Sequence, residues 1–534
     1  MKLFKKADHI KIYGFLTGAV FVLAALVLLL LSYYAVTGSW LSRDYMGLVS
    51  SFMPDKALTH ILIAVVILIA FTCGDYIWKK FFSKHEKKAE SVVLILTSIL
   101  MLLAGTKFMM HHPYYPIGDQ VNTFFGGVYA AKEGFEYRYA MFAPGGYFGI
   151  YPQQKGLAFF YMTMYKVFGD DLLPIMELFH LIYPQIILYA GFGALRKEKV
   201  PSFGRVFFCM LMISCIPVYL YIPYMYGDLP SIAFSFCCMY FIATFLESGR
   251  LRHATGVCVF AALAVFVRMQ IWIFVIAVLI TLLLEAIKRK KLKYAVTAVC
   301  VILSCFIATS SVQRYYDSVS GYGHVDGVPS LCWVAMGLQM SGNNPGVYNR
   351  YNQGSFESNG FDADKTAQDA KEDIKNSIAE MKSSRDYTVS FFALKLRQEW
   401  TEPDFNGYFE TGVFWNYKSG TFESETPAWL TGLYSGELCI KAVNFMNYYQ
   451  SVVYLLCLAF ALICLFGKRS KATAVSVMSL IYLIGGFLFF LVWENKSRYI
   501  LPFFMCLVWC VPVAACEVSN ALSRAKKSLK IQKN

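Results

Sequence analysis

Residues 253–287 read HATGVCVFAALAVFVRMQIWIFVIAVLITLLLEAI, an apolar run of 35 residues with Arg268 near its middle. A helix of this length rises about 52 Å, whereas the hydrocarbon core of a bilayer is only about 30 Å thick. One crossing therefore cannot accommodate the run. We predict two short membrane spans instead, 253–267 and 270–287, with a turn at Arg268-Met269.

Long apolar runs fill most of the remaining chain as well. Hydrophobic residues make up 57% of its 534 residues and charged residues only 16%, against about 25% charged residues in an average soluble domain. This composition excludes a soluble enzyme, a disordered chain and a coiled coil. We predict an all-α polytopic membrane protein with about twelve transmembrane helices. The ten further runs are 13–36, 57–79, 91–110, 172–195, 203–223, 229–247, 293–311, 447–467, 472–493 and 499–518.

The segment 156–168 (GLAFFYMTMYKVF) fits either a thirteenth span or a helix in the membrane interface. We favour the interfacial helix because all short basic loops then face the cytoplasm. Those loops and both termini hold 27 Lys and Arg, and the three short connections on the other side hold 4. The sequence thus predicts a multi-pass protein with both termini cytoplasmic. The net charge of +14 follows from this bias, so we expect no nucleic-acid partner.

Two long segments remain outside, 111–171 and 312–446. The second is less apolar, contains a helical stretch near 362–383, and is long enough for a folded extracytoplasmic loop domain of mixed structure. We predict four parts: two N-terminal transmembrane helices in 1–89, a membrane module with its outer loop in 90–311, the loop domain in 312–446, and C-terminal transmembrane helices with a basic cytoplasmic tail in 447–534.

The first outer segment carries polar residues that suit chemistry at the membrane surface. Asp119 and Gln120 follow a predicted span by about nine residues. A carboxylate there can take a proton from an attacking hydroxyl, although a surface Asp that caps the next helix fits as well. Gln153, Gln154 and Lys155 open the interfacial helix. Lys155 faces a lipid phosphate or an acceptor, or simply extends to the headgroups.

Two more charged residues lie beside apolar spans on the outer side. Asp228 occupies the turn Tyr226-Gly227-Asp228-Leu229-Pro230, where it is either functional or a helix cap. Arg268 lies about 22 Å above the cytoplasmic end of its span. A cation at that depth needs a partner. A lipid phosphate is one candidate because Arg binds phosphate through two hydrogen bonds, and outer headgroups are the other.

The short turn between the last two spans breaks the charge rule. Glu494, Lys496 and Arg498 lie in it, so it has two cations where the rule expects none. The cations are suited to binding a phosphate leaving group, with Glu494 orienting one of them, or the turn is simply neutralised locally. Two patches in the long loop, 333–349 and 400–405, combine aromatic and Asn or Gly residues, which suit sugar rings and equally a small domain's core.

Taken together, these motifs resemble the GT-C superfamily of integral-membrane glycosyltransferases, which use polyprenyl-phosphate sugars. The resemblance rests on Gly118-Asp119-Gln120, Tyr151-Pro152-Gln153-Gln154, Tyr226-Gly227-Asp228-Leu229-Pro230 and the late Glu494…Ser497-Arg498-Tyr499…Pro502. It covers about 90–311 well and 447–518 loosely. The spans 13–36 and 57–79 precede the family's usual first helix. The first acidic motif is a single Asp, so no cofactor is certain and a divalent metal stays an open option.

The resemblance implies a bacterial cell-membrane enzyme that moves a sugar to a cell-surface glycan, lipid or protein with inversion. Asp119 would be the general base and Asp228 would position the acceptor or the base. Arg268, Lys496 and Arg498 would stabilise the departing phosphate. Two other functions stay open. A transporter or flippase of lipid-linked glycans would need midplane charges, for which Asp75, Glu177 and His180 are candidates. A glycan polymerase would lengthen its product and use a diphosphate-linked donor.

Overall fold

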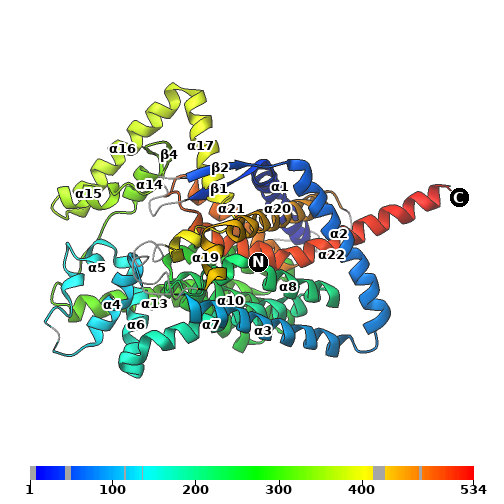
Figure 1. Ribbon diagram of the computed structural model, residues 1–534, viewed down its shortest axis with the longest axis horizontal. Coiled ribbons are helices and arrows are strands. Elements are labelled where there is room, and N and C mark those ends of the chain that lie inside the picture. Colours follow the sequence, from blue (N-terminus) through cyan, green and yellow to red (C-terminus); the bar gives the residue numbers. More distant parts are fainter. Residues whose placement is uncertain are drawn as a thin grey trace.

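The computed structural model describes residues 8–42, 50–112, 116–134, 136–412, 427–467 and 472–533. These residues are almost entirely helical, and one group of helices stands apart at one end of the long ones (Figure 1). Three segments that the sequence analysis used lie outside the described residues. They are the N-terminal lysines within 2–6, residues 113–115 of the first outer segment, and the basic loop 468–471.

Every predicted membrane span coincides with a helix. Among the described residues, nine helical segments are long and apolar enough to cross a membrane. They contain α1 (Asp8–Thr37), α2 (Ala57–Phe82), α3 (Glu86–His111), α7 (Leu172–Lys197), α10 (Asp228–Ser248), α12 (Trp272–Arg289), α13 (Leu292–Val319), α20 (Glu437–Phe466) and α22 (Leu501–Lys533). Three shorter apolar helices cover the other predicted spans, namely α8 (Ser202–Ser214), α11 (Leu251–Val267) and α21 (Ala474–Phe490).

The long run 253–287 divides where the sequence predicts. Helix α11 ends at Val267, η4 (Met269–Ile271) follows, and α12 begins at Trp272. A second division was not predicted. The run 203–223 forms α8 and then the short α9 (Ile216–Leu220), because Pro217 has no N–H to donate to the preceding turn. The carbonyl of Ile213 accepts a hydrogen bond from the Tyr219 hydroxyl at 3.2 Å instead.

The segment between α3 and α7 is helical but broken. It contains α4 (Asp119–Ala131), η1 (Ala140–Phe142), α5 (Tyr147–Ile150), η2 (Pro152–Gln154), α6 (Lys155–Phe168) and η3 (Gly169–Asp171). The helix predicted at 156–168 is therefore present as α6, and it packs along α4. Gly127 makes this close approach feasible, since a β-carbon there would lie 2.5 Å from the carbonyl oxygen of Ala158.

The loop domain predicted as mixed is nearly all helical in its described part. It consists of α14 (Leu331–Gly337), α15 (Tyr351–Ser358), α16 (Ala363–Ser383), α17 (Arg385–Trp400) and α19 (Ala428–Tyr434), with the two-residue strands β3 (Met340–Ser341) and β4 (Asn344–Pro345). Helix α16 matches the helical stretch predicted near 362–383. Side-chain oxygens of Asp362 and Ser384 accept backbone N–H bonds at the starts of α16 and α17.

The N-terminal helices belong to the same packed body as the C-terminal ones. Helix α1 packs along α20 and α21, and α2 packs against α20. The hairpin β1 (Gly38–Ser42) and β2 (Ser50–Pro54) follows α1, and the Trp40 N–H donates to the Thr401 carbonyl at 3.2 Å. The first two helices thus reach the loop domain through this hairpin.

Helix α22 lies at the centre of the bundle. All residues from Leu501 to Val511 are buried, and apart from Pro502 each of them is at most 1% exposed. The Trp509 indole N–H donates a hydrogen bond to the Gly191 carbonyl at 3.0 Å. A helix that is apolar on all sides is expected to be surrounded by other helices. Its central position brings the preceding residues 494–500 to the middle of one end of the bundle, beneath the loop domain (Figure 1).

Candidate functional site

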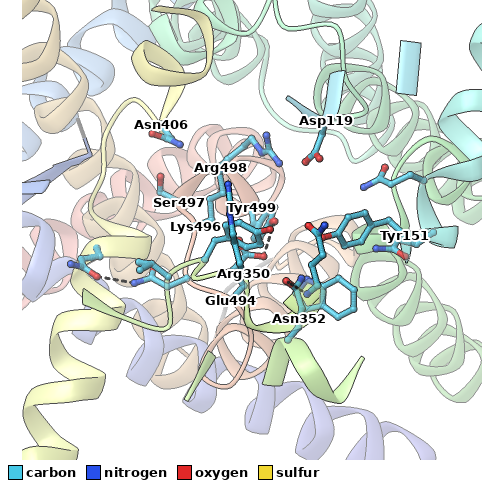
Figure 2. Close-up of a pocket in the computed structure, with 18 of the residues that line it drawn as sticks. Asp119, Tyr151, Arg350, Asn352, Asn406, Glu494, Lys496, Ser497, Arg498 and Tyr499 are labelled. Atoms are coloured by element: carbon cyan, nitrogen blue, oxygen red, sulfur yellow. Dashed lines mark hydrogen bonds between the residues drawn. The ribbon is translucent and has the colours of Figure 1, made fainter. Parts of the chain in front are cut away.

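A cavity of about 510 Å³ lies where the loop helices meet this end of the bundle (Figure 2). Its walls come from four distant parts of the chain: Trp40 of β1, residues 119–154, loop residues 333–406 and the turn 494–499. The volume lies within the range of about 300–1,000 Å³ that is typical of small-molecule sites. The cavity therefore joins the first outer segment to the turn that breaks the charge rule.

Asp119 lies on one side of the cavity as the first residue of α4. The helix is capped by Gly118, whose φ of 53° is left-handed, and the Asp119 side chain makes no capping bond. Its Oδ1 accepts a hydrogen bond from the Tyr147 hydroxyl at 3.0 Å. The capping alternative is thus not what the structure shows, and the half-buried carboxylate points into the cavity (Figure 2).

The two cations of the turn are organised by one buried carboxylate. Glu410 Oε1 lies 2.7 Å from Lys496 Nζ and 3.0 Å from Arg498 Nη1, and Glu410 is only 4% exposed. Burial alone would raise the pKa of Glu410, but the charges of Arg498 and Lys496 outweigh burial and hold that pKa below its ordinary value. This cluster of one anion and two cations therefore carries one net positive charge of its own.

Glu494 does not have the role that the sequence suggested. Glu410 makes both ion pairs, and Glu494 instead accepts a hydrogen bond from the Tyr499 hydroxyl at 3.2 Å. Burial raises the pKa of Glu494, and the charges of Lys496 and Arg498 offset only part of that rise. The prediction chose Glu494 because it is close to both cations in the sequence. Folding instead brings Glu410 of the loop domain into direct contact with Lys496 and Arg498.

Asp228 and Arg268 do not line the cavity, although the resemblance implies that Asp228 positions the acceptor or the base and that Arg268 stabilises the phosphate. Their side chains form a buried ion pair, with Arg268 Nη1 2.7 Å from Asp228 Oδ2. Each neutralises the other in an apolar interior, where an unpaired charge would be costly. Asp228 makes no capping bond to α10 either. The pair lies behind the cavity, since the Arg268 guanidinium stacks 5.7 Å from the Tyr499 ring, which lines it.

The glutamines and the lysine of the first outer segment separate into two groups. Gln153 and Gln154 line the cavity, whereas Gln120 and Lys155 are buried outside its lining. Lys155 Nζ lies 3.5 Å from Asp317 Oδ1. The interpretation of Lys155 as a side chain that reaches headgroups or an acceptor is therefore corrected, because it ties α6 to α13.

The loop domain supplies residues that sequence reasoning missed. Trp333 and Tyr348 give the wall aromatic faces, and the Trp333 ring stacks on Trp493 at 5.8 Å. The missed polar lining residues of the loop domain are Arg350, Asn352, Gln353, Glu357, Gln398 and Asn406. The aromatic patches 333–349 and 400–405 did indicate this wall, the second through Glu402, but Asn406 has no pattern that distinguishes it from ordinary loop residues.

The acids of the cavity do not gather as metal ligands. Within the described ranges, no group of three or more His, Cys, Asp or Glu side chains lies close enough to hold an ion. We derive no step through a divalent metal.

The chain belongs to the family described as "Conserved hypothetical integral membrane protein", whose model matches residues 12–517. No curated protein and no solved structure matches the chain. It is thus an integral membrane protein that contacts membrane lipids.

Proposed function

We propose that the protein is a membrane glycosyltransferase. It moves a sugar from a polyprenyl-phosphate donor to a glycan, lipid or protein acceptor on the extracytoplasmic face. One observation carries the proposal: Asp119 and the pair Lys496 and Arg498 line a single cavity, although they lie almost 400 residues apart. A base and a phosphate-binding cation pair are the two groups that this reaction needs.

The chemistry follows from these positions. Asp119 removes the proton from an acceptor hydroxyl, and the oxygen attacks the anomeric carbon from the side opposite the phosphate. The bond between that carbon and the phosphate oxygen breaks, and the polyprenyl phosphate leaves with the electron pair. Arg498 and Lys496 stabilise the negative charge on the departing phosphate. The anomeric configuration inverts because a single displacement occurs.

The charge distribution supports an outward-facing cavity. Helix α12 begins beside Arg268 near the cavity and ends at Lys288 and Arg289, and its 18 residues rise about 27 Å, close to the thickness of a bilayer core. Helix α7 also ends in basic residues, Arg196 and Lys197. Since basic helix ends favour the cytoplasm, the opposite end with the cavity faces outward, where an acceptor on the cell surface is within reach.

The test is the Asp119→Asn variant, assayed in proteoliposomes with a radiolabelled polyprenyl-phosphate hexose and cell-envelope glycan as acceptor. The change removes the proton acceptor and keeps the shape, so transfer should fall by about 10²–10⁴-fold. Asp171→Asn is the matched control, because Asp171 is exposed and lies outside the cavity lining. Transfer by Asp119→Asn at the rate of the control would refute the proposal.

A further inference from the structure

The turn that leads from α17 into the cavity has an unusual backbone. Phe405 and Asn406 both have left-handed φ angles, 51° and 63°. A bulky residue such as Phe405 rarely adopts this conformation, whereas Asn tolerates it better, so the strain that the surrounding structure must compensate lies mainly at Phe405. Here Tyr221 donates its hydroxyl hydrogen to the Phe405 carbonyl at 2.6 Å, and the Phe405 ring packs 4.8 Å from Phe504.

The consequence of this backbone is the position of Asn406. Its side chain is 5% exposed and lines the cavity. Among the residues that the structure describes, its Oδ1 is fully buried and has no hydrogen-bond partner. A buried amide oxygen without a partner costs free energy. Strain that positions an unsatisfied amide at a cavity indicates that a ligand completes its hydrogen bonds.

Arg498 shows the same deficiency. Its Nη1 donates to Glu410 and to the Tyr224 hydroxyl oxygen, but its buried Nε has no partner in the described part of the chain. Asn406 and Arg498 are tied together through Glu410, whose backbone N–H donates to the Asn406 carbonyl at 2.9 Å. We call these two residues the Asn406–Arg498 corner, and Figure 2 shows both at the cavity.

A ligand that satisfies this corner must combine two groups. A guanidinium whose Nε–H has no acceptor calls for an anion such as phosphate, and an amide oxygen without a donor calls for a hydroxyl, which can donate to it. A sugar 1-phosphate presents these groups on adjacent carbons, because the 2-hydroxyl is the nearest hydroxyl to the phosphoester.

We propose that the Asn406–Arg498 corner is the subsite for a hydroxylated glycosyl phosphate, in which Arg498 binds the phosphate and Asn406 binds the neighbouring 2-hydroxyl. This inference rests on the proposed function and adds a donor requirement to it. A site built to hydrogen-bond a hydroxyl discriminates strongly against a ligand that lacks it, because its own polar group is then left unpaired. The protein therefore selects donors with a free 2-hydroxyl over 2-deoxy donors and simple alkyl phosphates.

The test measures binding by the full chain in lipid nanodiscs, using calorimetry. The probes are the 1-phosphates of glucose, galactose, mannose and arabinose, with butyl phosphate and the 2-deoxy analogue of the tightest-binding sugar as references. We expect that sugar phosphate to bind at least about tenfold more tightly than either reference. Asn406→Gly keeps the left-handed backbone and removes the amide, so it should abolish this preference and leave butyl phosphate affinity unchanged.

Lys290→Gly is the matched control. Lys290 also has a left-handed φ, 53°, but it lies at the far end of α12. This variant should retain the wild-type preference. If the 2-deoxy analogue binds to the wild-type protein as tightly as its parent sugar phosphate, the assignment of the subsite is wrong. This comparison uses the wild-type protein alone, so it does not depend on the folding of a variant. An equal loss of affinity for sugar phosphate and butyl phosphate in Asn406→Gly also overturns it.

The two proposals fail separately. If the preference is independent of Asn406 while transfer still requires Asp119, the subsite is wrong and the glycosyltransferase stands. If the preference depends on Asn406 while Asp119→Asn transfers at the control rate, the corner binds glycosyl phosphates but the assigned chemistry is wrong.

Discussion

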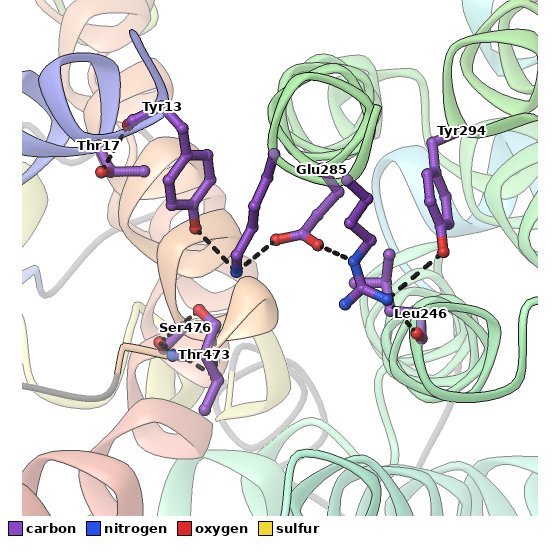
Figure 3. A network of polar contacts seen from close by, with 9 residues as sticks. Tyr13, Thr17, Leu246, Glu285, Tyr294, Thr473 and Ser476 are labelled. Carbon is purple, nitrogen blue, oxygen red and sulfur yellow. Dashed lines mark hydrogen bonds and ion pairs between the residues drawn. The ribbon is translucent and has the colours of Figure 1, made fainter. Parts of the chain in front are cut away.

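Two charged clusters lie at opposite ends of the membrane helices, and they differ in whether their polar groups are satisfied. At the far end from the Asn406–Arg498 corner, Glu285 is 1% exposed and pairs with Lys288 at 3.1 Å and Arg289 at 2.5 Å (Figure 3). Arg289 also donates to the Leu246 carbonyl at 2.5 Å. This Glu285 cluster connects α12 to α10 and, through Lys288 and the Tyr13 hydroxyl at 3.4 Å, to α1.

The comparison shows that cavity size does not identify the functional end. The cavity beside the Glu285 cluster is the larger of the two, about 650 Å³ against about 510 Å³. Its central ions already have protein partners, whereas the corner leaves Asn406 Oδ1 and Arg498 Nε without partners among the described residues. Satisfied ions connect helices. Unsatisfied groups held at a cavity by a strained backbone indicate a ligand.

The largest expected effect is at the corner. Arg498→Gln removes the cation that we propose to contact the phosphate, and it leaves Glu410 with Lys496 as its only ion-pair partner in the described structure. Loss of a group that stabilises transition-state charge costs about 10²–10³-fold in rate. We expect transfer from a polyprenyl-phosphate hexose to fall by at least that factor. A rate within threefold of wild type would contradict the role of Arg498.

The same kind of change at the other end should separate stability from activity. Glu285→Gln keeps the side-chain shape but removes the anion from two cations that are only partly buried. We expect the free energy of unfolding to fall by about 1–3 kcal/mol, seen as a lower Tm in detergent, with kcat per folded molecule unchanged. A selective loss of kcat at unchanged Tm would show that the Glu285 cluster serves the reaction.

A third prediction concerns Asp404, a buried carboxylate next to the strained turn. Burial raises the pKa of Asp404 to about 6. Because the folded-state pKa exceeds the value of about 3.9 for an unfolded Asp, this group makes the protein less stable as pH rises from about 4 to 6, and the cost persists above that window. Asp404→Asn should therefore unfold at a higher temperature than wild type at pH 8, by about 1–3 kcal/mol in free energy, and at a similar temperature near pH 4. The opposite order at pH 8 would show that Asp404 is stabilised as an anion.

The sequence predicted the helices of this molecule better than the contacts of its site. Apolar length alone gave the turn at Arg268, since 35 residues cannot fit one crossing. The sequence also contains Pro217, which explains the division of the run 203–223 into two helices that we did not predict. The cation excess at 494–498 located one wall of the cavity. Glu410 could not be found this way, because its partners Lys496 and Arg498 lie far away in the sequence and only the fold brings them together.

The smallest expected effect compares the two ends most directly, because the same substitution relieves the same backbone strain at each. Asn406→Gly and Lys290→Gly both replace a left-handed residue by one that adopts this conformation freely. Each should raise the free energy of unfolding by about 0.4–1 kcal/mol, and Asn406→Gly should be the more stabilising, since it also removes a buried amide oxygen without a partner. Only Asn406→Gly should slow transfer. In our proposal, the backbone strain at 405–406 positions a side chain that binds the ligand, whereas the strain at Lys290 positions no such group. Equal transfer rates for the two variants would mean that the turn at 405–406 is a feature of the fold alone.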